Sequence, residues 1–282
     1  MNSTIDPPAS ERDSTSHVAP TTPPSFSIAL SNWLTIISIL MVEQLTRRTK
    51  SGRLGLIIVI AEPFALVGSF YFLHSMIRNL VQPYGESLLL FLVSGFLPFY
   101  LFLRTSIQGR IGGTRVGRLP RITSLDGFIA GVAAQVIIWI PVMAIAFLAM
   151  WLYGIERARP ASIAECAAAL LFLTLLGAGL GLINSVIARF MPAWPMVIGV
   201  AMRGMLLLSG VIHIPDFFYP SVRAWLAWNP ILHGVDWFRL GVYGRYPVLL
   251  LDQFYLMKCA VILLFIGMVA DRATLRYGTR TR

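Results

Sequence analysis

The chain has 282 residues, of which 56% are hydrophobic and 13% are charged, and its net charge is +10. Soluble domains carry about 25% charged residues, so a chain this apolar is expected to have the lipid bilayer as its solvent. The positive charge is nearly all arginine and stands in short segments between apolar runs. This placement is typical of cytoplasmic loops and excludes nucleic acid as the expected partner, because nucleic-acid binding needs a soluble basic face.

Two regions stand before the first apolar run. Residues 1–27 are polar and rich in Ser, Thr and Pro, and they are expected to form a disordered tail without a secretory signal. Residues 28–46 carry apolar side chains at helical spacing, interrupted by Asn32, Ser38 and Glu43. This pattern predicts an amphipathic helix that lies in the membrane interface. The transmembrane domain is therefore expected to occupy residues 28–282.

Six apolar runs are each near the ~20 residues that a helix needs to cross a bilayer. They predict transmembrane helices at 55–74, 87–107, 128–153, 163–187, 194–212 and 252–270. Arginines dominate the segments expected on one side: Arg110, Arg115, Arg118 and Arg121 stand in a segment without an acid, and the carboxyl tail carries Arg272, Arg276, Arg280 and Arg282. On the other side, acids accompany the arginines: Glu86 goes with Arg78, and Glu156 goes with Arg157 and Arg159. This bias predicts an all-α, multi-pass membrane protein with both termini in the cytoplasm.

The segment 213–251 fits neither an interface helix nor a span. It is dense in aromatic residues and is broken by Pro215, Pro220, Pro230 and Pro247. Two stretches, 221–229 and 231–241, are predicted as helices too short to cross alone. They are expected to be re-entrant on the periplasmic side, between spans five and six, which is tolerated where protein or water covers the broken backbone.

Four segments, in order, carry a resemblance to known exporters. They are Arg53-Leu54-Gly55 with Glu62-Pro63, Gly95-Phe96-Leu97-Pro98-Phe99, Gly177-Ala178-Gly179-Leu180-Gly181, and Trp228-Asn229-Pro230-Ile231-Leu232-His233. In these segments, and over residues 40–275, the chain resembles the type-2 ABC transporter permeases that export capsular polysaccharide and lipopolysaccharide O-antigen. It departs from the family's usual Tyr-Leu-Trp after Gly55, where it has Leu56-Ile57-Ile58. This change removes aromatic residues from the expected channel mouth.

The resemblance implies a homodimer of permeases that works with two ATP-hydrolysing subunits on the cytoplasmic side. The chain has no Gly-x-x-x-x-Gly-Lys-Ser/Thr loop, so ATP and Mg²⁺ are expected on a separate partner chain, with no cofactor and no enzymatic activity in this one. The implied cargo is a capsular or surface polysaccharide on a lipid carrier. A periplasmic adaptor that leads to an outer-membrane channel is left open as a further partner.

Two basic segments are expected on the cytoplasmic side. Residues 108–123, which hold Arg110, Arg115, Arg118 and Arg121, are similar in place to the family's coupling helix, which docks on the ATPase; the alternative is a plain positive-inside loop. A basic rim of Arg47, Arg48, Lys50 and Arg53 is expected to attract anionic lipid head groups where the substrate enters.

Arg203 and Glu62 are charged residues inside predicted spans. An arginine at the centre of a span costs about 2.5–3.5 kcal/mol on insertion scales, so it needs a partner or a water-filled path. We expect Arg203 to face the translocation channel and to meet an anionic substrate group, with pairing to a carboxylate or to backbone carbonyls as the alternative. Glu62 precedes Pro63, which loosens the helix, and its open roles are to cap the broken backbone, to pair with Arg53 or to line the entry.

Several other residue types have a structural and a functional interpretation. Trp228 and Trp237 suit stacking on sugar faces along the substrate path, or they belong to the aromatic belt of the interface. Asp236 and Arg239 stand three apart on one helical face and are expected to pair. Close helix approach is expected at Gly177, Gly179, Gly181, Gly199 and Gly204. Cys166, Cys259 and the scattered histidines indicate buried structural groups rather than a metal site.

Two alternatives to polysaccharide export on a lipid carrier are open. An exporter of the same fold could carry O-antigen, teichoic acid or a small hydrophobic molecule. An integral-membrane acyl- or glycosyltransferase would need acids or histidines clustered at one membrane face. Such a cluster is not expected, because the acids fall at different depths or sides: Glu62, Asp126, Glu156 and Asp236.

Overall fold

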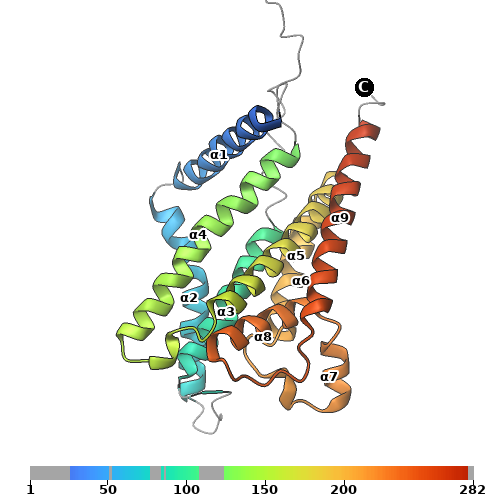
Figure 1. Ribbon diagram of the computed structural model, residues 1–282. Helices are drawn as coiled ribbons and strands as arrows, with labels where there is room; N and C mark the ends of the chain where they lie inside the picture. The colour runs from blue at the N-terminus through green and yellow to red at the C-terminus, as the bar shows by residue number, and fades with distance from the viewer. Residues whose placement is uncertain (1–25, 51–52, 77–83, 86, 108–123, 279–282) are drawn as a thin grey trace, which may run out of the picture. The chain divides into compact units, whose positions relative to one another are not determined.

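The computed structural model describes residues 26–50, 53–76, 84–85, 87–107 and 124–278, and it divides the chain into two units, residues 1–35 and 36–282. The described residues form nine α-helices and two short 3₁₀ helices, with no strand (Figure 1). The helices are α1 (Phe26–Lys50), α2 (Arg53–Met76), α3 (Leu88–Ser106), α4 (Ser124–Leu152), α5 (Ile163–Phe190), α6 (Trp194–Leu208), α7 (Pro220–Leu226), α8 (Pro230–Tyr243) and α9 (Gln253–Gly278). The 3₁₀ helices are η3 (Glu156–Ala158) and η4 (Pro215–Phe217). The prediction of an all-α protein is confirmed for this part of the chain.

Each of the six predicted spans is a helix. Four of them, α3, α4, α5 and α9, are long and apolar enough to cross a membrane, whereas the apolar parts of α2 and α6 are shorter. The fifth span was predicted to run to residue 212, but α6 ends at Leu208. The chain turns there through Gly210, whose φ is +68° and where a Cβ atom would lie 2.9 Å from Cγ of Pro215. Four candidate spans are therefore shown, and six remain a prediction.

The predicted interface helix, residues 28–46, lies within α1, which begins at Phe26. In the second half of α1, Leu40 is buried, and Nε2 of Gln44 donates a hydrogen bond to the Gly127 carbonyl at 2.8 Å, which joins α1 to the start of α4. Its place in the membrane interface stays a prediction. The predicted disordered tail lies outside the described residues, apart from its last two, which belong to α1.

The core forms around α3 and α5. All side chains of α3 from Leu90 to Phe102 are buried, and α5 packs against α3, α8 and α9. Glycines permit this packing, as predicted, because a Cβ atom at Gly179 would lie 2.5 Å from the backbone of Leu264 in α9. At Gly199 and Gly204, by contrast, a Cβ atom would meet no described atom within 4 Å. Those two glycines of α6 therefore do not serve packing against the described residues.

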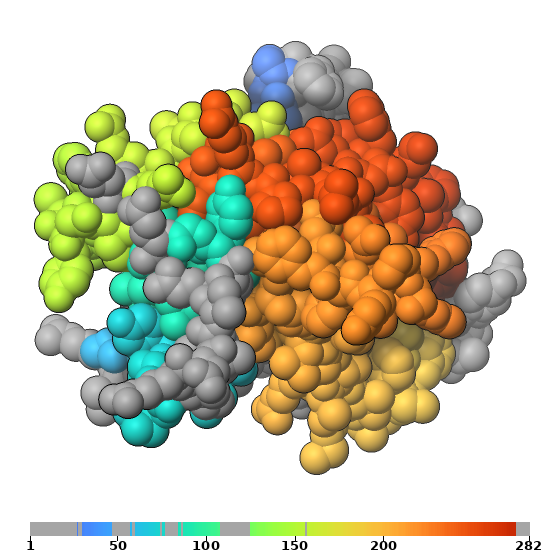
Figure 2. All heavy atoms as spheres, turned by 90° about the horizontal axis from the view of Figure 1, so that it is seen from below, coloured from blue at the N-terminus to red at the C-terminus, as the bar shows by residue number. Residues whose placement is uncertain are grey.

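Both predicted short helices are present, as α7 and α8. Nearly all of α8 is buried against α3, α5 and α9, while Trp225 and Trp228 at the end of α7 are exposed. The end of the bundle where α3, α5 and α9 begin is called here the α8 end, and Figure 2 shows it with the chain from α7 into α9 in orange to red. The opposite end, where α3 and α5 finish and α6 begins, is called the Asn184 end.

Candidate functional site

An ion pair between Glu62 of α2 and Arg104 of α3 joins a predicted span to a candidate span. Arg104 is mostly buried, with 18% of its side chain exposed, whereas 51% of the Glu62 side chain is exposed. The guanidinium carbon of Arg104 lies 5.9 Å from the centroid of the Tyr100 ring, and the Tyr100 hydroxyl is within hydrogen-bonding reach of Glu62. Among the described side chains, the partner of Glu62 is therefore Arg104, whereas the side chain of Arg53, the partner that the sequence offered, lies outside the described part.

Arg203 of α6 is a further charged residue inside a predicted span, and its place along its helix matches that of Glu62. Glu62 and Arg203 each stand nine residues after the first residue of their helices, Arg53 and Trp194. At a rise of 1.5 Å per residue, both lie about 14 Å along helices that start at the same end under the predicted topology. Glu62, Tyr100, Arg104 and Arg203 are called here the charge cluster.

The surroundings of Arg203 are open and apolar. Met196, Val200, Arg203 and Leu207 repeat at helical spacing along α6 and are all exposed. Among the described residues, no carboxylate lies within ion-pair distance of Arg203. A guanidinium in an exposed apolar stripe is unfavourable against lipid, so this stripe needs a second protein surface or water beside it.

Tyr100 and Arg104 were not among the site residues predicted from the sequence. Arg104 stands in the last turn of α3, where an arginine ordinarily reports only the positive-inside bias. Its role depends on α2 and α3 packing side by side, which brings the first half of one helix to the last turns of the other. A search for acids and bases at matched depth in consecutive antiparallel spans could have found this pair.

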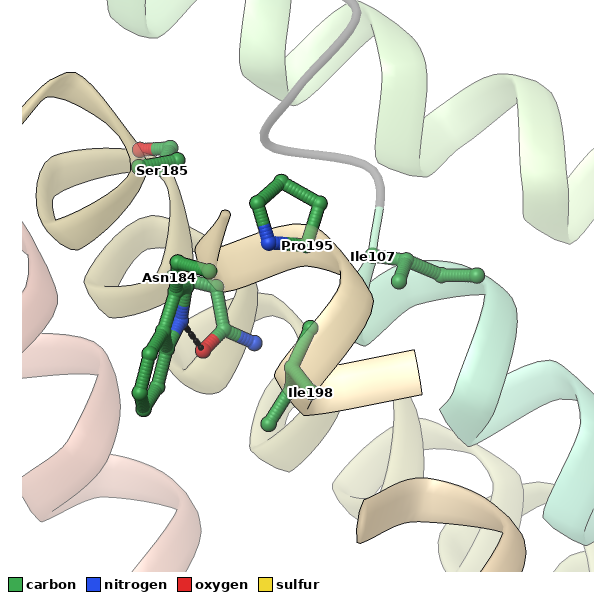
Figure 3. Close-up of a pocket in the computed structure, with 7 residues that line it drawn as sticks. Ile107, Asn184, Ser185, Pro195 and Ile198 are labelled. Carbon is green, nitrogen blue, oxygen red and sulfur yellow. Dashed lines mark hydrogen bonds between the residues drawn. The ribbon is translucent and has the colours of Figure 1, made fainter. Parts of the chain in front are cut away.

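At the Asn184 end, a pocket of about 430 Å³ lies between the last turn of α3, the end of α5 and the start of α6. Figure 3 shows Asn184 and Pro195 on its walls, with Ile107 at the edge. The Asn184 amide nitrogen donates to the Ser106 carbonyl at 3.1 Å, and its oxygen accepts a hydrogen bond from Nε1 of Trp194 at 3.1 Å. Asn184 therefore joins α3, α5 and α6 at one point.

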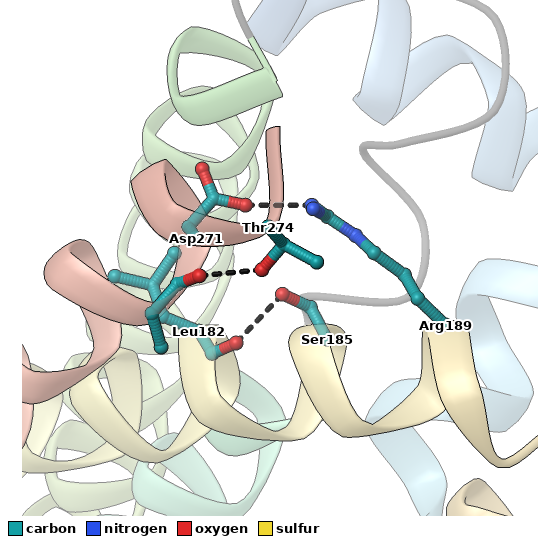
Figure 4. A network of polar contacts seen from close by, with 6 residues as sticks. Leu182, Ser185, Arg189, Asp271 and Thr274 are labelled. Atoms are coloured by element: carbon teal, nitrogen blue, oxygen red, sulfur yellow. Dashed lines mark hydrogen bonds and ion pairs between the residues drawn. The ribbon is translucent and has the colours of Figure 1, made fainter. Parts of the chain in front are cut away.

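A second polar contact at this end fastens α5 to α9. Arg189 pairs with Asp271 at 2.6 Å, and only 4% of the Asp271 side chain is exposed. Figure 4 shows this pair beside the Ser185 and Thr274 hydroxyls, each of which bonds a carbonyl of its own helix. The Asn184 end is thus held by side-chain contacts among α3, α5, α6 and α9.

Most side chains of the predicted basic segments lie outside the described part of the chain. The proposed coupling residues, Arg110, Arg115, Arg118 and Arg121, lie outside the described residues, which resume at residue 124. The backbones of Arg47, Arg48 and Lys50 belong to α1 and that of Arg53 to α2, and their side chains also lie outside the described part. The coupling segment and the basic rim remain predictions.

The Trp-Asn-Pro-Ile-Leu-His segment forms a junction at the α8 end. Oδ1 of Asn229 caps α8 by accepting a hydrogen bond from the Ile231 amide at 3.0 Å, and Pro230 takes the first helical position. The Asn229 amide nitrogen donates to the Leu208 carbonyl at 3.1 Å and to the Ser209 hydroxyl at 3.0 Å. One side chain therefore starts α8 and ties it to the end of α6.

His233 extends this junction to α9. Its Nδ1 accepts a hydrogen bond from the Asp252 amide at 3.1 Å, so Nε2 carries the proton and donates to the Ala227 carbonyl at 2.9 Å. Burial lowers the pKa of His233, which is consistent with a neutral ring. The contacts of Asn229 and His233 give the segment a structural role.

The two tryptophans proposed for the substrate path lie in different settings. Trp237 is buried, with 3% exposed; it stacks on Phe172 at 5.9 Å and donates to the Glu165 carboxylate. That position is inside the protomer core, where a sugar has no access. Trp228 is 76% exposed beside Asn229, and its carbonyl accepts a hydrogen bond from the Tyr255 hydroxyl at 2.9 Å. Of the two, only Trp228 is available to a partner.

The expected pairing of Asp236 with Arg239 is wrong. Arg239 is fully buried and donates to the carbonyls of Gly210 at 2.5 Å and Val211 at 2.7 Å, with the Phe91 ring 3.8 Å away. The irregular chain after α6 supplies these carbonyls, which a helix would have used internally. Asp236 is also buried, and burial raises its pKa to about 7.

Among the described residues, no group of three or more His, Cys, Asp or Glu side chains is placed to hold a metal ion. Cys166 is buried and Cys259 partly buried, and both are free thiols. Polar side chains of the described bundle gather in the charge cluster, in the two end junctions and in the buried network around Arg239.

No protein-family model matches the chain. Two polysialic acid transport proteins KpsM of Escherichia coli are each 24% identical to it over 246 residues, which cover 84% of this chain and 92% of each relative. The capsule polysaccharide export inner-membrane protein CtrC of Neisseria meningitidis serogroup B is 22% identical over 253 residues, 86% of this chain and 92% of the relative. These similarities confirm the resemblance carried by the four ordered segments. The chain is similar to the capsule polysaccharide export inner-membrane proteins, and this similarity supports the type-2 ABC transporter permease family.

Proposed function

We propose that this chain is the permease subunit of an ATP-driven exporter that moves a capsular or surface polysaccharide, carried on a lipid, across the inner membrane. The observation that carries the proposal is Arg203, which stands on an exposed apolar stripe at the depth of the Glu62–Arg104 pair. The cluster has two guanidinium groups and one carboxylate, so it suits an anionic group on the cargo. Similarity to capsule exporters over most of the chain supports the same cargo class.

Two copies of the chain form the path in this proposal. The exposed stripe of α6 and the exposed Glu62 side of α2 face the second copy, with the charge cluster lining the space between them. Gly199 and Gly204 support this arrangement, since they leave α6 smooth on a side where no described atom of the same protomer approaches. The six predicted spans and cytoplasmic termini place the α8 end in the periplasm.

ATP hydrolysis on a separate partner chain drives the transport. Residues 108–123 transmit the movement of that subunit. They follow directly after Ile107, which lies at the edge of the pocket at the Asn184 end. Through Asn184, a displacement at the end of α3 reaches the start of α6, the helix that carries Arg203. The mechanical link from ATPase to charge cluster is therefore short.

The experiment is co-purification of the tagged permease with an ATPase encoded beside it, followed by ATP-dependent export of the polysaccharide in proteoliposomes. We expect a complex with two copies of each chain whose export stops with Arg203→Gln and is partly retained with Arg203→Lys. Conversion of a substrate by the permease alone, with no ATPase bound, would overturn the proposal in favour of a membrane enzyme.

A further inference from the structure

A second basic site lies at the α8 end, far along the bundle from the charge cluster. It is a pocket of about 730 Å³ between the loop after α4, the residue Tyr84 before α3, and the end of α8. Its basic and aromatic walls come from Tyr84, Arg157, Arg159, Tyr243 and Arg245. They are called here the arginine pocket.

The walls of the pocket are fixed by backbone contacts. The Ala161 amide donates to the Val242 carbonyl at 3.1 Å and the Ser162 amide to the Gly241 carbonyl at 2.8 Å, so the loop after α4 is tied to the last turn of α8. The Tyr84 hydroxyl donates a hydrogen bond to the Arg245 carbonyl, which ties the residue before α3 to the chain at the end of α8. The pocket is thus a built feature of the fold.

Two arginines of the pocket supply the charge that a ligand could meet. Arg159 and Arg245 are exposed, and none of the described lining residues is acidic. The Arg159 guanidinium carbon lies 5.6 Å from the centroid of the Trp151 ring, a contact that orients the group.

The remaining wall is aromatic. The rings of Tyr84 and Tyr243 meet edge to face at 5.2 Å, and Tyr84 makes a similar contact with Tyr246. Such rings suit the CH faces of a sugar, while guanidinium groups suit a carboxylate. A lipid phosphate would use the arginines but would leave the aromatic wall without a partner.

We propose that the arginine pocket binds an acidic sugar residue of the polymer, with its carboxylate on Arg159 and Arg245 and its ring face on the tyrosines. The site is an exit contact separate from the charge cluster, and it rests on the proposed function for the polymer cargo and for the periplasmic orientation of this end. Nothing in the proposed transport cycle requires it, so its failure would leave the exporter function standing.

The test is binding of hexagalacturonate to the full-length permease in nanodiscs of zwitterionic lipid, without the ATPase, with neutral maltohexaose as the comparison probe. We expect salt-sensitive binding of the acidic probe alone. Loss of one arginine should weaken it by about fivefold, the upper range for exposed charge pairs. The test variants are Arg159→Gln and Arg245→Gln, with Arg223→Gln of α7 as the matched control at the same end. Arg159→Lys and Arg245→Lys, which keep the charge, should retain most of the binding, and thermal unfolding checks that each variant is folded.

Three results would overturn the proposal. Equal binding of both probes would show that the protein does not distinguish an acidic sugar from a neutral one. Equal effects of Arg159→Gln and Arg223→Gln would place the binding elsewhere. Retention of an anionic phospholipid by the wild type but not by Arg159→Gln, with no binding of hexagalacturonate, would identify a lipid phosphate as the ligand instead.

Discussion

The side chain of Asn184 on α5 accepts a hydrogen bond from the indole of Trp194, the first residue of α6, at 3.1 Å. The same side chain donates to the carbonyl of Ser106, the last residue of α3, at 3.1 Å. The predicted coupling segment begins two residues after Ser106, and α6 carries Arg203. Asn184 therefore stands between the segment expected to receive ATPase movement and the helix expected to line the path.

Replacement of Asn184 by Ala should uncouple ATP hydrolysis from export. The change leaves the Trp194 Nε1 and the Ser106 carbonyl without their partner, which costs about 1–3 kcal/mol for each buried group. We expect a lower melting temperature and fewer polymers exported per ATP hydrolysed by the reconstituted complex. Ser185→Ala is the matched control, because Ser185 lines the same pocket but bonds only the Leu182 carbonyl of its own helix. Export per ATP that is unchanged in Asn184→Ala would remove Asn184 from the coupling route.

The Glu62–Arg104 pair should show a measurable but modest coupling energy. Half of Glu62 is exposed, so the pair is worth about 1 kcal/mol or less in a double-mutant cycle. Glu62→Gln and Arg104→Gln should each lower the melting temperature of the wild type. Either change should lower it by less when it is made in a protein that already carries the other. Strict additivity of the two changes would mean that the pair does not contribute to stability.

Asn229→Ala should destabilise the protein by about 1 kcal/mol through loss of the α8 cap, with a further loss from its bonds to α6. Asn229→Ser is the control that keeps a capping oxygen but loses both amide donors. The expected order of melting temperatures is wild type, then Asn229→Ser, then Asn229→Ala. If the Ala variant were as stable as the Ser variant, Asn229 would not act as a cap.

Asp236 should make stability fall as the pH rises through about 7. Burial raises its pKa from 3.8 to about 7, so between pH 6.5 and 8 the folded protein binds more protons than the unfolded chain. The contribution of Asp236 to the free energy of unfolding should therefore drop by about 1 kcal/mol over this interval. Burial lowers the pKa of His213 and His233, and an unfolded histidine still binds protons over the lower part of this interval, so these two residues act in the opposite sense there.

The check is thermal unfolding of the wild type and of Asp236→Asn across the same pH interval. The Asn variant keeps the side-chain shape without the titrating carboxyl, so the melting temperature of the wild type should fall relative to that of Asp236→Asn as the pH rises. An equal slope in both proteins would show that another group titrates.

Hydropathy and charge bias predicted much of this fold, because each span can be recognised from the apolar composition of its own residues. Six apolar runs became six helices, and the breaks at proline marked both short helices. The end of α6 could not be placed in this way, since the turn at Gly210 depends on Pro215 packing against it. Helix α9 runs eight residues past the predicted span, because a helix need not stop where the apolar run does.

The candidate site was only half visible in the sequence. Arg203 and Glu62 stood out because a charge inside a span is rare. Trp237 was expected on the substrate path or in the interface belt, and Arg239 was expected to pair with Asp236. Instead, Arg239 finds free carbonyls in an irregular segment and Trp237 finds Glu165 across the α5–α8 contact. Those partners are distant along the chain, so no local pattern announced them.

Water access at position 203 tests most directly whether α6 lines a path between two copies. In a background of Cys166→Ala and Cys259→Ala, the rate of modification by a charged methanethiosulfonate reagent would be measured for Arg203→Cys. Ile145→Cys, on the exposed apolar surface of α4, is the lipid-facing comparison. A thiol reacts as its thiolate, which forms in water and not in hydrocarbon. The account predicts fast modification at 203, slowed by the polysaccharide, and slow modification at 145. Equally slow modification at both positions would contradict it and place Arg203 against lipid.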